Sequence, residues 1–433
     1  MEHYEQRIVN GILKSNLASD PEAALRLLNR DIEVIVSPER ATQRDLWPAL
    51  WALCSVLERQ FTGNVYINAG LEGPLEQPAR LSRRCIFGKP DEGGALLKIA
   101  LGCDIAGERE HAIIGDARGN RVAYGKMLAG QGAATPVSCF ALAGYLGFAA
   151  LAETLQIPPH REDLAQTELE LPAPETQPAF SEAGLTLWGL GHLGNAYLSL
   201  LFFKCRNDGF NAEIALLDGG NLEDGNWHTH ILVEEDSKWL GESKATYLAE
   251  RLKTWGLTPI RDQLTLNWGW TRPSSHPDLV LMGFDNFPAR RMIAAAGYSW
   301  LIESGIGDSF IEPKLTWHSV PADAELAKRL FPDRENAPGS TPEGRFAETL
   351  RTKPGCGFLH YGQIHASAPS MGLIASAFVW SELLRVTKQP QETISGAAAL
   401  WSPILPYFRE QLSPKVAPRL LGSQLLLGSE RLK

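Results

Sequence analysis

The segment Leu185–Gly194, which reads LTLWGLGHLG, is the feature that most constrains how this 433-residue chain folds. A short apolar run meets a GxGxxG loop made by Gly189, Gly191 and Gly194, and an apolar helical pattern follows. A second apolar run then ends in Asp218. This order is typical of a nucleotide-binding βαβ unit, in which glycines let the backbone approach a phosphate and the helix N-terminus offers N–H groups. Asp218 is placed where a carboxylate binds a ribose hydroxyl.

Composition excludes several classes of protein. The net charge of -9 argues against a general nucleic-acid binder. The N-terminus lacks the apolar region of a signal peptide, and no apolar stretch reaches the roughly 18 residues of a membrane span. The longest candidate, 137–151, is interpreted as a buried helix. The six cysteines form no CxxC pair, which fits a reducing cytosol and excludes a familiar structural zinc site. We expect a cytoplasmic protein that binds neither nucleic acid nor membrane.

The chain is expected to contain two domains. Five prolines among acidic and glutamine residues predict a linker at 157–182. It separates an N-terminal α/β domain, 1–156, from a nucleotide-binding domain, 183–433. The N-terminal domain has no GxGxxG motif, so we expect no nucleotide there. We predict an α/β fold class with a Rossmann-like, mostly parallel sheet in the second domain, preceded by the smaller α/β domain.

Periodicity predicts the individual elements. In the first domain, strands are expected at 31–37, 64–68, 94–101 and 112–115, and helices at 46–60 and 136–155. In the second domain, strands are expected at 215–218, 278–282, 300–303 and 311–318, and helices at 244–255, 290–296 and 370–386. A stretch rich in charge, proline and glycine predicts an excursion at about 320–365.

Asp285 favours Mg·ATP over NAD as the ligand. The sequence Gly283-Phe-Asp285-Asn286 directly follows a predicted strand, and ligands of open parallel sheets lie beyond the carboxyl ends of the strands. A carboxylate beside phosphates is repulsive unless a divalent cation bridges them, and Mg²⁺ takes one or two carboxylates plus phosphate oxygens. Lys244, at the start of its helix, is a candidate to neutralise the phosphates, and Asn226 is a candidate to reach the ribose or phosphates.

The order of these residues resembles the adenylation domain of ubiquitin-activating enzymes. Bacterial relatives in thiamine and molybdopterin synthesis, the ThiF and MoeB type, share this order. The resemblance covers about residues 183 to 390. It includes the glycine loop, Asp218, Asn226, Gly241-x-x-Lys244, Asp285-Asn286, and the closing segment 368–384, which has a proline followed by a small-residue helix.

The resemblance implies a particular reaction. Members bind Mg·ATP and the C-terminal glycine carboxylate of a ubiquitin-fold protein, and that carboxylate attacks the α-phosphorus to give an acyl-adenylate and pyrophosphate. Many members then move the acyl group to a cysteine as a thioester. By the resemblance, the nucleotide would be held by the three glycines with Asn226 and Asn286, the ribose by Asp218, the phosphates by Lys244 and the magnesium by Asp285.

The sequence departs from the family pattern in two places. The family usually has Asn-x-x-Arg-Gln after the ribose-binding acid, whereas this chain has Thr229 at the arginine position. Threonine cannot replace the charge, so a phosphate contact is missing or comes from elsewhere, and Arg7 on the first predicted helix is one candidate. The zinc-binding CxxC pairs of the family are also absent.

Cys356 is the candidate thiol for the thioester. It lies between Gly355 and Gly357, after the predicted excursion, where glycines favour an accessible thiolate. His360 and His365 are close in sequence and are candidates to lower its pKa. Family members that form thioesters carry a cysteine in this general region.

The resemblance also extends to the N-terminal domain. Ubiquitin-activating enzymes pair an active adenylation half with an inactive one, and the run Gly130–Pro136 before an apolar helix is similar to the run before the closing helix. The layout resembles compact activating enzymes of bacterial ubiquitin-like conjugation systems, some encoded in antiviral operons. The expected partners are a ubiquitin-like protein and a conjugating enzyme, and a homodimer is left open.

Three alternatives remain at this point. An adenylyltransferase for a sulfur carrier or peptide would need Asp285 but no thioester. An NAD-dependent oxidoreductase would fit Asp218 but not Asp285. A non-catalytic scaffold would fit the replacement at Thr229.

Overall fold

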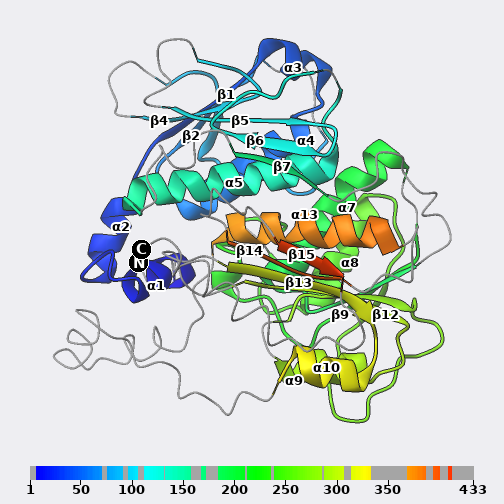
Figure 1. Cartoon of the computed structure of the whole chain (residues 1–433). Coiled ribbons are helices and arrows are strands. Elements are labelled where there is room, and N and C mark those ends of the chain that lie inside the picture. The colour runs from blue at the N-terminus through cyan, green and yellow to red at the C-terminus, as the bar shows by residue number, and fades with distance from the viewer. Residues whose placement is uncertain are drawn as a thin grey trace, which may run out of the picture.

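The computed structural model describes fourteen stretches of the chain: 6–70, 76–90, 96–105, 112–130, 132–157, 167–171, 184–209, 212–235, 238–284, 287–306, 314–332, 368–386, 394–399 and 408–411. The predicted site residues Asp285, Asn286 and Cys356 lie outside the described residues. The described stretches form two α/β halves, one above the other, with long helices between their sheets (Figure 1).

The N-terminal half contains a seven-stranded sheet in the order β3-β2-β1-β4-β5-β6-β7. The strands β1 to β5 pair in parallel, and β6 and β7 are antiparallel. Alternate side chains of β1 are buried in the main core, as expected for a strand with one face against a helix layer. The strands are β1 Ile32–Val36, β2 Val65–Asn68, β3 Cys85–Phe87, β4 Leu97–Leu101, β5 Ala112–Arg118, β6 Arg121–Tyr124 and β7 Thr167–Glu170.

The C-terminal half contains an eight-stranded sheet in the order β10-β9-β8-β11-β12-β13-β14-β15. When the strands of each sheet are numbered along the chain, the two sheets have the same strand order, and the second sheet has one further strand at its edge. Pairing is parallel from β10 to β12 and antiparallel beyond. This is a Rossmann-like order, which confirms the predicted fold class. The strands are β8 Leu185–Trp188, β9 Ile214–Leu217, β10 Ile260–Asp262, β11 Leu279–Met282, β12 Trp300–Ile306, β13 Lys314–Pro321, β14 Ile394–Ala399 and β15 Phe408–Gln411.

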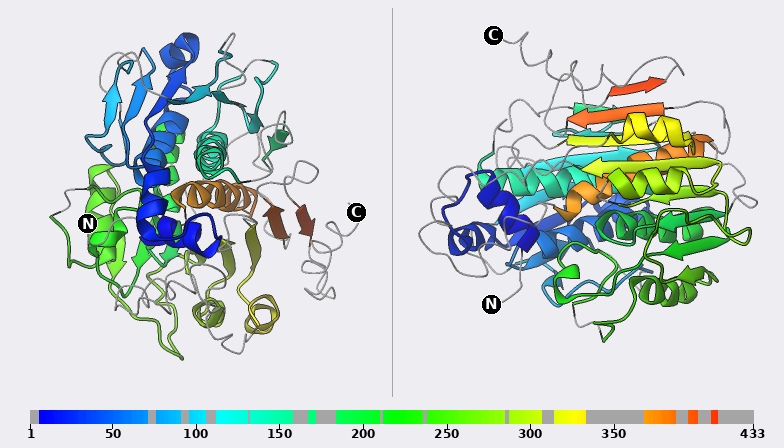
Figure 2. Two further views of the ribbon diagram at one scale, coloured as in Figure 1. Left: turned by 90° about the vertical axis from the view of Figure 1, so that its left-hand side faces the viewer. Right: turned by 90° about the horizontal axis from the view of Figure 1, so that it is seen from below.

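Four helices fill the space between the sheets: α4 Trp47–Gln60, α5 Pro136–Leu155, α7 His192–Asp208 and α13 Pro369–Val386. The helices α5 and α13 each follow the sixth strand of their own sheet and pack on one another, as the end-on view in Figure 2 shows. Their buried residues belong to one hydrophobic core that includes side chains of both halves.

The remaining helices are arranged around the two sheets. On the far face of the second sheet, α9 Phe287–Ala294 and α10 Ala324–Leu330 cover a separate core (Figure 1). The N-terminus contributes α1 Gln6–Lys14 and α2 Pro21–Leu28. Connections contain α3 Pro38–Gln43, the 3-10 turn η1 Asp224–Asn226 and α8 Lys244–Thr254.

The helix α5 has the length and hydropathy of a membrane span, but 89% of its most apolar window is buried within the protein. The apolar face is therefore used in packing against α4 and α13. Its bounds follow from local sequence: Thr135 accepts a hydrogen bond from the Ser138 N–H at 3.2 Å, and Pro136 occupies the first turn.

The stretch expected as a linker, 157–182, contains β7, which pairs with β6 at the edge of the first sheet. Residues 167–170, within the expected linker, therefore form an edge strand of the first sheet. A strand of four residues is identified by its pairing with a neighbouring strand, because it is too short to have a clear hydrophobic period in the sequence. The expected domain boundary itself stays a prediction.

Candidate functional site

The glycine loop joins β8 to α7 at the carboxyl edge of the second sheet. Gly189 has a φ of +80°, a left-handed conformation that glycine adopts without strain. A Cβ placed on Gly194 would lie 2.2 Å from the carbonyl oxygen of Gly189, and one on Gly283 would lie 2.5 Å from the same oxygen. Because contact normally occurs near about 3.5 Å, only glycine fits at these positions. Gly283 had no predicted role.

Asp218 ties the glycine loop to the end of β9. Its Oδ2 accepts a hydrogen bond from the Leu190 N–H at 2.6 Å, and its Oδ1 accepts one from the Gly220 N–H at 2.7 Å. A carboxylate has about four acceptor positions, so these two bonds leave capacity for a ribose hydroxyl. The carboxylate is half-buried at the edge where the glycine loop begins. Its ribose-binding role stays a prediction.

Lys244 lies on the same side of the sheet edge. It begins α8, whose N-cap Ser243 accepts a hydrogen bond from the Thr246 N–H. The Lys244 backbone N–H donates to the Gly220 carbonyl at 3.1 Å, and a Cβ on Gly220 would lie 3.5 Å from Lys244 Nζ and 3.1 Å from Asp218 Oδ1. The structure thus brings the glycine loop, Asp218 and Lys244 together.

Asn226 organises the turn that follows η1. Its Oδ1 accepts a hydrogen bond from the Glu223 N–H at 3.1 Å, and its carbonyl oxygen accepts from the N–H groups of Thr229 and His230 at 3.2 and 2.8 Å. Thr229 and His230 are both buried. These hydrogen bonds show that Asn226 stabilises the turn. Its nucleotide contact stays a prediction.

Thr229 orients His230 towards the glycine loop. The Thr229 hydroxyl and His230 Nδ1 are 2.9 Å apart, and a Cβ on Gly191 would lie 4.0 Å from His230 Nε2. Thr229, which stands where the resembled family has arginine, therefore contacts a histidine that adjoins the N-terminus of α7.

Arg290 fixes the backbone directly before Asp285. Its Nη2 donates to the carbonyl oxygens of Phe284 at 2.7 Å and Ser304 at 3.1 Å, and its Nη1 pairs with Glu303 Oε2 at 2.5 Å. Neither Arg290 nor Glu303 was singled out in the sequence. Both are fully or almost fully buried, so a buried ion pair holds the chain just after β11 at Phe284.

The surroundings of this ion pair perturb two ionisable groups. Burial outweighs the attraction of Arg290 and raises the pKa of Glu303 to about 7. His318 Nε2 lies 3.8 Å from Glu303 Oε1, and burial together with Arg290 lowers the pKa of His318 to about 3. His318 is therefore neutral at physiological pH, while Glu303 titrates close to it.

Cys54, Cys85 and Cys139 are poor nucleophiles in this structure. Burial raises the pKa of Cys54 and Cys139, which lie in α4 and α5, and it also raises the pKa of Cys85. Cys356 belongs to the undescribed part of the chain, so its accessibility and neighbours stay predictions. Among the described residues, no group of three or more His, Cys, Asp or Glu side chains is arranged to hold a metal ion.

The equivalent edge of the first sheet has different chemistry. There β1 leads through Ser37 into α3, and the Arg40 guanidinium fills the edge. Its Nε donates to Asp45 Oδ1 at 3.0 Å, and its Nη1 donates to Asp116 Oδ1 at 2.9 Å. A buried ion cluster therefore takes the position that the glycine loop has in the second sheet.

Comparison with known proteins finds similarity in the C-terminal half. Residues 182–389 match a family model described as the BilD C-terminal domain. A curated relative, the bacterial E1-like protein BilD of Collimonas sp. (strain OK412), is 26% identical over 223 residues, which cover 50% of this chain and 47% of the relative. The chain thus spans about half the length of the curated relative that it matches.

Two solved structures also match part of the chain. E. coli MccB, solved with AMPCPP and MccA, is 15% identical and has a TM-score of 0.35 over 54% of this chain and 65% of its own. PaaA is 12% identical and has a TM-score of 0.33 over 53% of this chain and 64% of its own.

Proposed function

We propose that this chain activates a ubiquitin-like protein at the expense of ATP. It adenylates the C-terminal glycine of that protein, captures the acyl group on Cys356 as a thioester, and passes it to a conjugating enzyme. The observation that carries the proposal is the convergence of the glycine loop, Asp218 and Lys244 at one sheet edge, within the stretch that matches the family model of the BilD C-terminal domain.

The described residues suit the binding of a nucleoside triphosphate as substrate. The close-packed glycines bring backbone N–H groups and the N-terminus of α7 to the phosphates, where the helix dipole favours negative charge. Lys244 supplies a cation beside Gly220, and Asp218 offers acceptors to the ribose. Asp285 would hold Mg²⁺, which neutralises phosphate charge as pyrophosphate leaves.

The proposed reaction has two balanced steps. A carboxylate oxygen of the C-terminal glycine bonds to the α-phosphorus, and the bond to the bridging oxygen of pyrophosphate breaks. The thiolate of Cys356 then bonds to the acyl carbon, and AMP leaves with the carboxyl oxygen. The thiol proton is lost before the second step, because the thiolate is the nucleophile.

The first step is tested by ATP–pyrophosphate exchange with candidate ubiquitin-fold proteins. We expect Lys244→Ala and Asp285→Asn to slow exchange by about 10²- to 10³-fold, because each removes charge stabilisation from the reacting phosphates. Lys253→Ala is the matched control, because Lys253 lies on the same helix with its side chain exposed and paired to Glu250. Exchange by Lys244→Ala at the control rate would contradict the proposal.

The second step is tested by a thioester that survives non-reducing electrophoresis and is cleaved by thiol. Cys356→Ala should retain pyrophosphate exchange and lose this adduct. If the variant still forms the final product at the normal rate, the chain is an adenylyltransferase that acts on a carrier protein or peptide without a thioester. Alkylation before unfolding should spare Cys54 and Cys139, whose raised pKa values and burial keep them as thiols.

The remaining alternatives have distinct signatures. Tight binding of NADH with no binding of ATP would indicate an oxidoreductase, and a folded protein that binds no nucleotide would indicate a scaffold. Cytoplasmic location and a part in antiviral defence are further proposals, tested by fractionation and by phage challenge of cells with and without Cys356.

A further inference from the structure

Arg59 reaches from the N-terminal half across to the C-terminal half. It lies near the end of α4, and its Nε donates to the carbonyl oxygen of Trp227 at 2.9 Å. Its Nη2 donates to the carbonyl oxygen of Val233 at 2.9 Å. The guanidinium also lies over the Trp227 ring, 5.0 Å from the ring centroid. One side chain therefore holds both ends of residues 227–233, which we call the clamped segment.

Arg59 is itself held rigidly by its own helix. Its Nη1 donates to the Ser55 carbonyl at 2.6 Å and pairs with Glu58 Oε1 at 2.5 Å. Glu58 Oε2 accepts from the Ser82 N–H at 2.7 Å, so the carboxylate is fixed as well. Arg59 and Glu58 are 3% and 0% exposed, which means that the guanidinium has little freedom to leave the clamped segment.

The clamped segment carries His230 to the glycine loop. Thr229 and His230 both turn back onto the Asn226 carbonyl, and the Thr229 hydroxyl sets the ring of His230. His230 Nε2 then faces Gly191, the N-cap residue of α7. A shift of the clamped segment would move this imidazole relative to the helix N-terminus that receives the phosphates in the proposed reaction.

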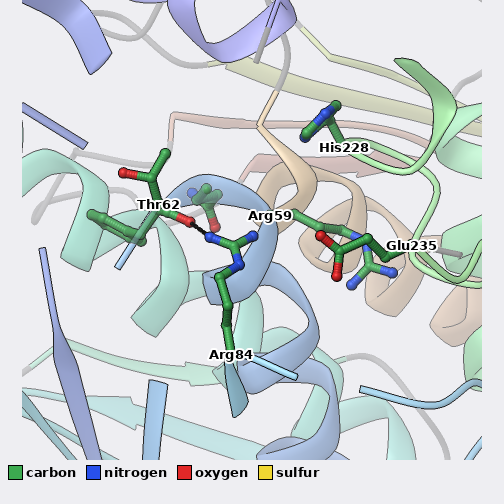
Figure 3. Close-up of a pocket in the computed structure, with 7 residues that line it drawn as sticks. Arg59, Thr62, Arg84, His228 and Glu235 are labelled. Carbon is green, nitrogen blue, oxygen red and sulfur yellow. Dashed lines mark hydrogen bonds between the residues drawn. The ribbon is translucent and has the colours of Figure 1, made fainter. Parts of the chain in front are cut away.

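A cavity borders the Arg59 side chain. A cavity of about 260 Å³ lies between the halves, lined by Arg59, Gln60, Phe61, Thr62, Arg84, His228 and Glu235 (Figure 3). Arg84 also lies over the Trp227 ring, 5.5 Å from its centroid, and donates to the Phe61 and Glu58 carbonyls. The hydrogen bonds of Arg84 in the described structure thus stay within the N-terminal half, whereas those of Arg59 cross the junction.

We propose that Arg59 is a positioning residue by which the N-terminal half controls nucleotide affinity in the C-terminal half. It does so by ordering the clamped segment and thereby placing His230 beside Gly191. The part of this inference that concerns nucleotide rests on the proposed function; the ordering of the segment does not. The N-terminal half is then a component of the active site without contacting the substrate.

The test compares the wild-type protein with a full-length variant that lacks both charges of the buried ion pair. Arg59→Met alone would leave Glu58, and Glu58→Gln alone would leave Arg59, as an uncompensated buried charge, so the variant is the double substitution Glu58→Gln with Arg59→Met and its reference is the wild type. We expect the double variant to bind a fluorescent ATP analogue at least tenfold more weakly than its reference. Amide hydrogens of residues 227–233 should exchange at least tenfold faster, while those of α5 and α13 keep their rates.

Two further variants make the result specific. Arg84→Met removes the other guanidinium that lies over the Trp227 ring and should change the dissociation constant by less than twofold. Arg59→Lys keeps the positive charge but lacks the planar guanidinium with its several N–H donors, so we expect an intermediate affinity. If the double variant does not fold, Arg59→Lys is compared with the wild type instead. Equal nucleotide affinity and equal exchange in the double variant and its reference would overturn the proposal. A wild-type protein that binds no nucleotide would instead remove the proposed function, and hydrogen exchange would still test the clamp.

Discussion

Three glycines, at 189, 194 and 283, let the backbone of β8, α7 and β11 meet without intervening side chains. A Cβ on Gly194 or on Gly283 would clash with the carbonyl oxygen of Gly189. The loop can adopt its shape because β8, β11 and α7 approach this oxygen without side chains between them. A methyl group on Gly194 or Gly283 would have to displace backbone atoms, which move less easily than the end of a flexible side chain.

Gly194→Ala tests this contact. We expect a loss of about 2 kcal/mol in the free energy of unfolding, as for other overpacked sites, and a nucleotide affinity at least tenfold weaker because the loop is displaced. Gly225→Ala is the control, because a Cβ there would meet nothing within 4 Å. Urea unfolding and titration with an ATP analogue measure both effects. Equal behaviour of the two variants would show that the loop tolerates a side chain.

Glu303 predicts a particular dependence of stability on pH. Its pKa rises from 4.5 to about 7 on folding, so the unfolded state ionises first, and the stability it contributes is complete below about pH 4.5 and is lost as the pH rises towards 7. The loss is on the order of 3 kcal/mol. Glu303→Gln should abolish this component. The measurement is the difference in unfolding free energy between wild type and variant at pH 5 and pH 7.5, and a difference that is constant with pH would contradict the assignment.

At the scale of elements, α5 and α13 occupy equivalent places in their two halves. Each begins with a proline, follows the sixth strand of its sheet, and packs on the other. Close approach depends on Gly144, since a Cβ there would lie 2.5 Å from Ile374 Cγ1 and 2.7 Å from the Ser370 carbonyl oxygen. The contact between these helices is the principal junction between the two halves.

Gly144→Ala separates helix propensity from packing. In an isolated helix this change stabilises by about 0.5–1 kcal/mol, whereas overpacking typically costs about 1–3 kcal/mol. Because the nearest atoms include a backbone carbonyl, we expect net destabilisation of about 1 kcal/mol. Chemical denaturation gives the sign directly, and a stabilised variant would mean that α5 and α13 do not touch at this point.

At the scale of the whole molecule, one hydrophobic core joins the two halves. It includes residues of α4 and α5 from the first half and of α7 and α13 from the second. Polar contacts add to the junction. Near the end of α7, Arg206 forms an ion pair with Glu76 of the first half, and near the end of α4, Arg59 donates a hydrogen bond to the Trp227 carbonyl of the clamped segment. Separation of the halves would expose the apolar faces of all four helices.

The shared core predicts a single thermal transition. Differential scanning calorimetry should give one peak whose calorimetric and van't Hoff enthalpies agree, because neither half can unfold without exposing the helix layer of the other. Gly144→Ala should move that peak as a whole. Two resolved peaks would show that the halves are independent units.

Much of the fold was predictable because its signals are local. Caps and prolines define α5 and α8, and the glycine loop with its flanking apolar runs defines β8 and α7. The short strands β3, β7 and β10 escaped prediction, because three or four residues carry no clear period and are stabilised by their neighbours. At the site, Asp218 and Lys244 were expected near the loop and lie there, while Asp285, Asn286 and Cys356 stay predictions.

The sequence by itself determined the fold class, the place of the glycine loop and the chemistry that such a loop favours, since these depend on residues close together in the chain. Only the tertiary structure decided what supports the loop. Arg59 is 168 residues from Trp227, and Arg290 reaches Glu303 across two elements. No periodicity connects such pairs: their bonds form only when packing has excluded water and each buried charge needs a partner.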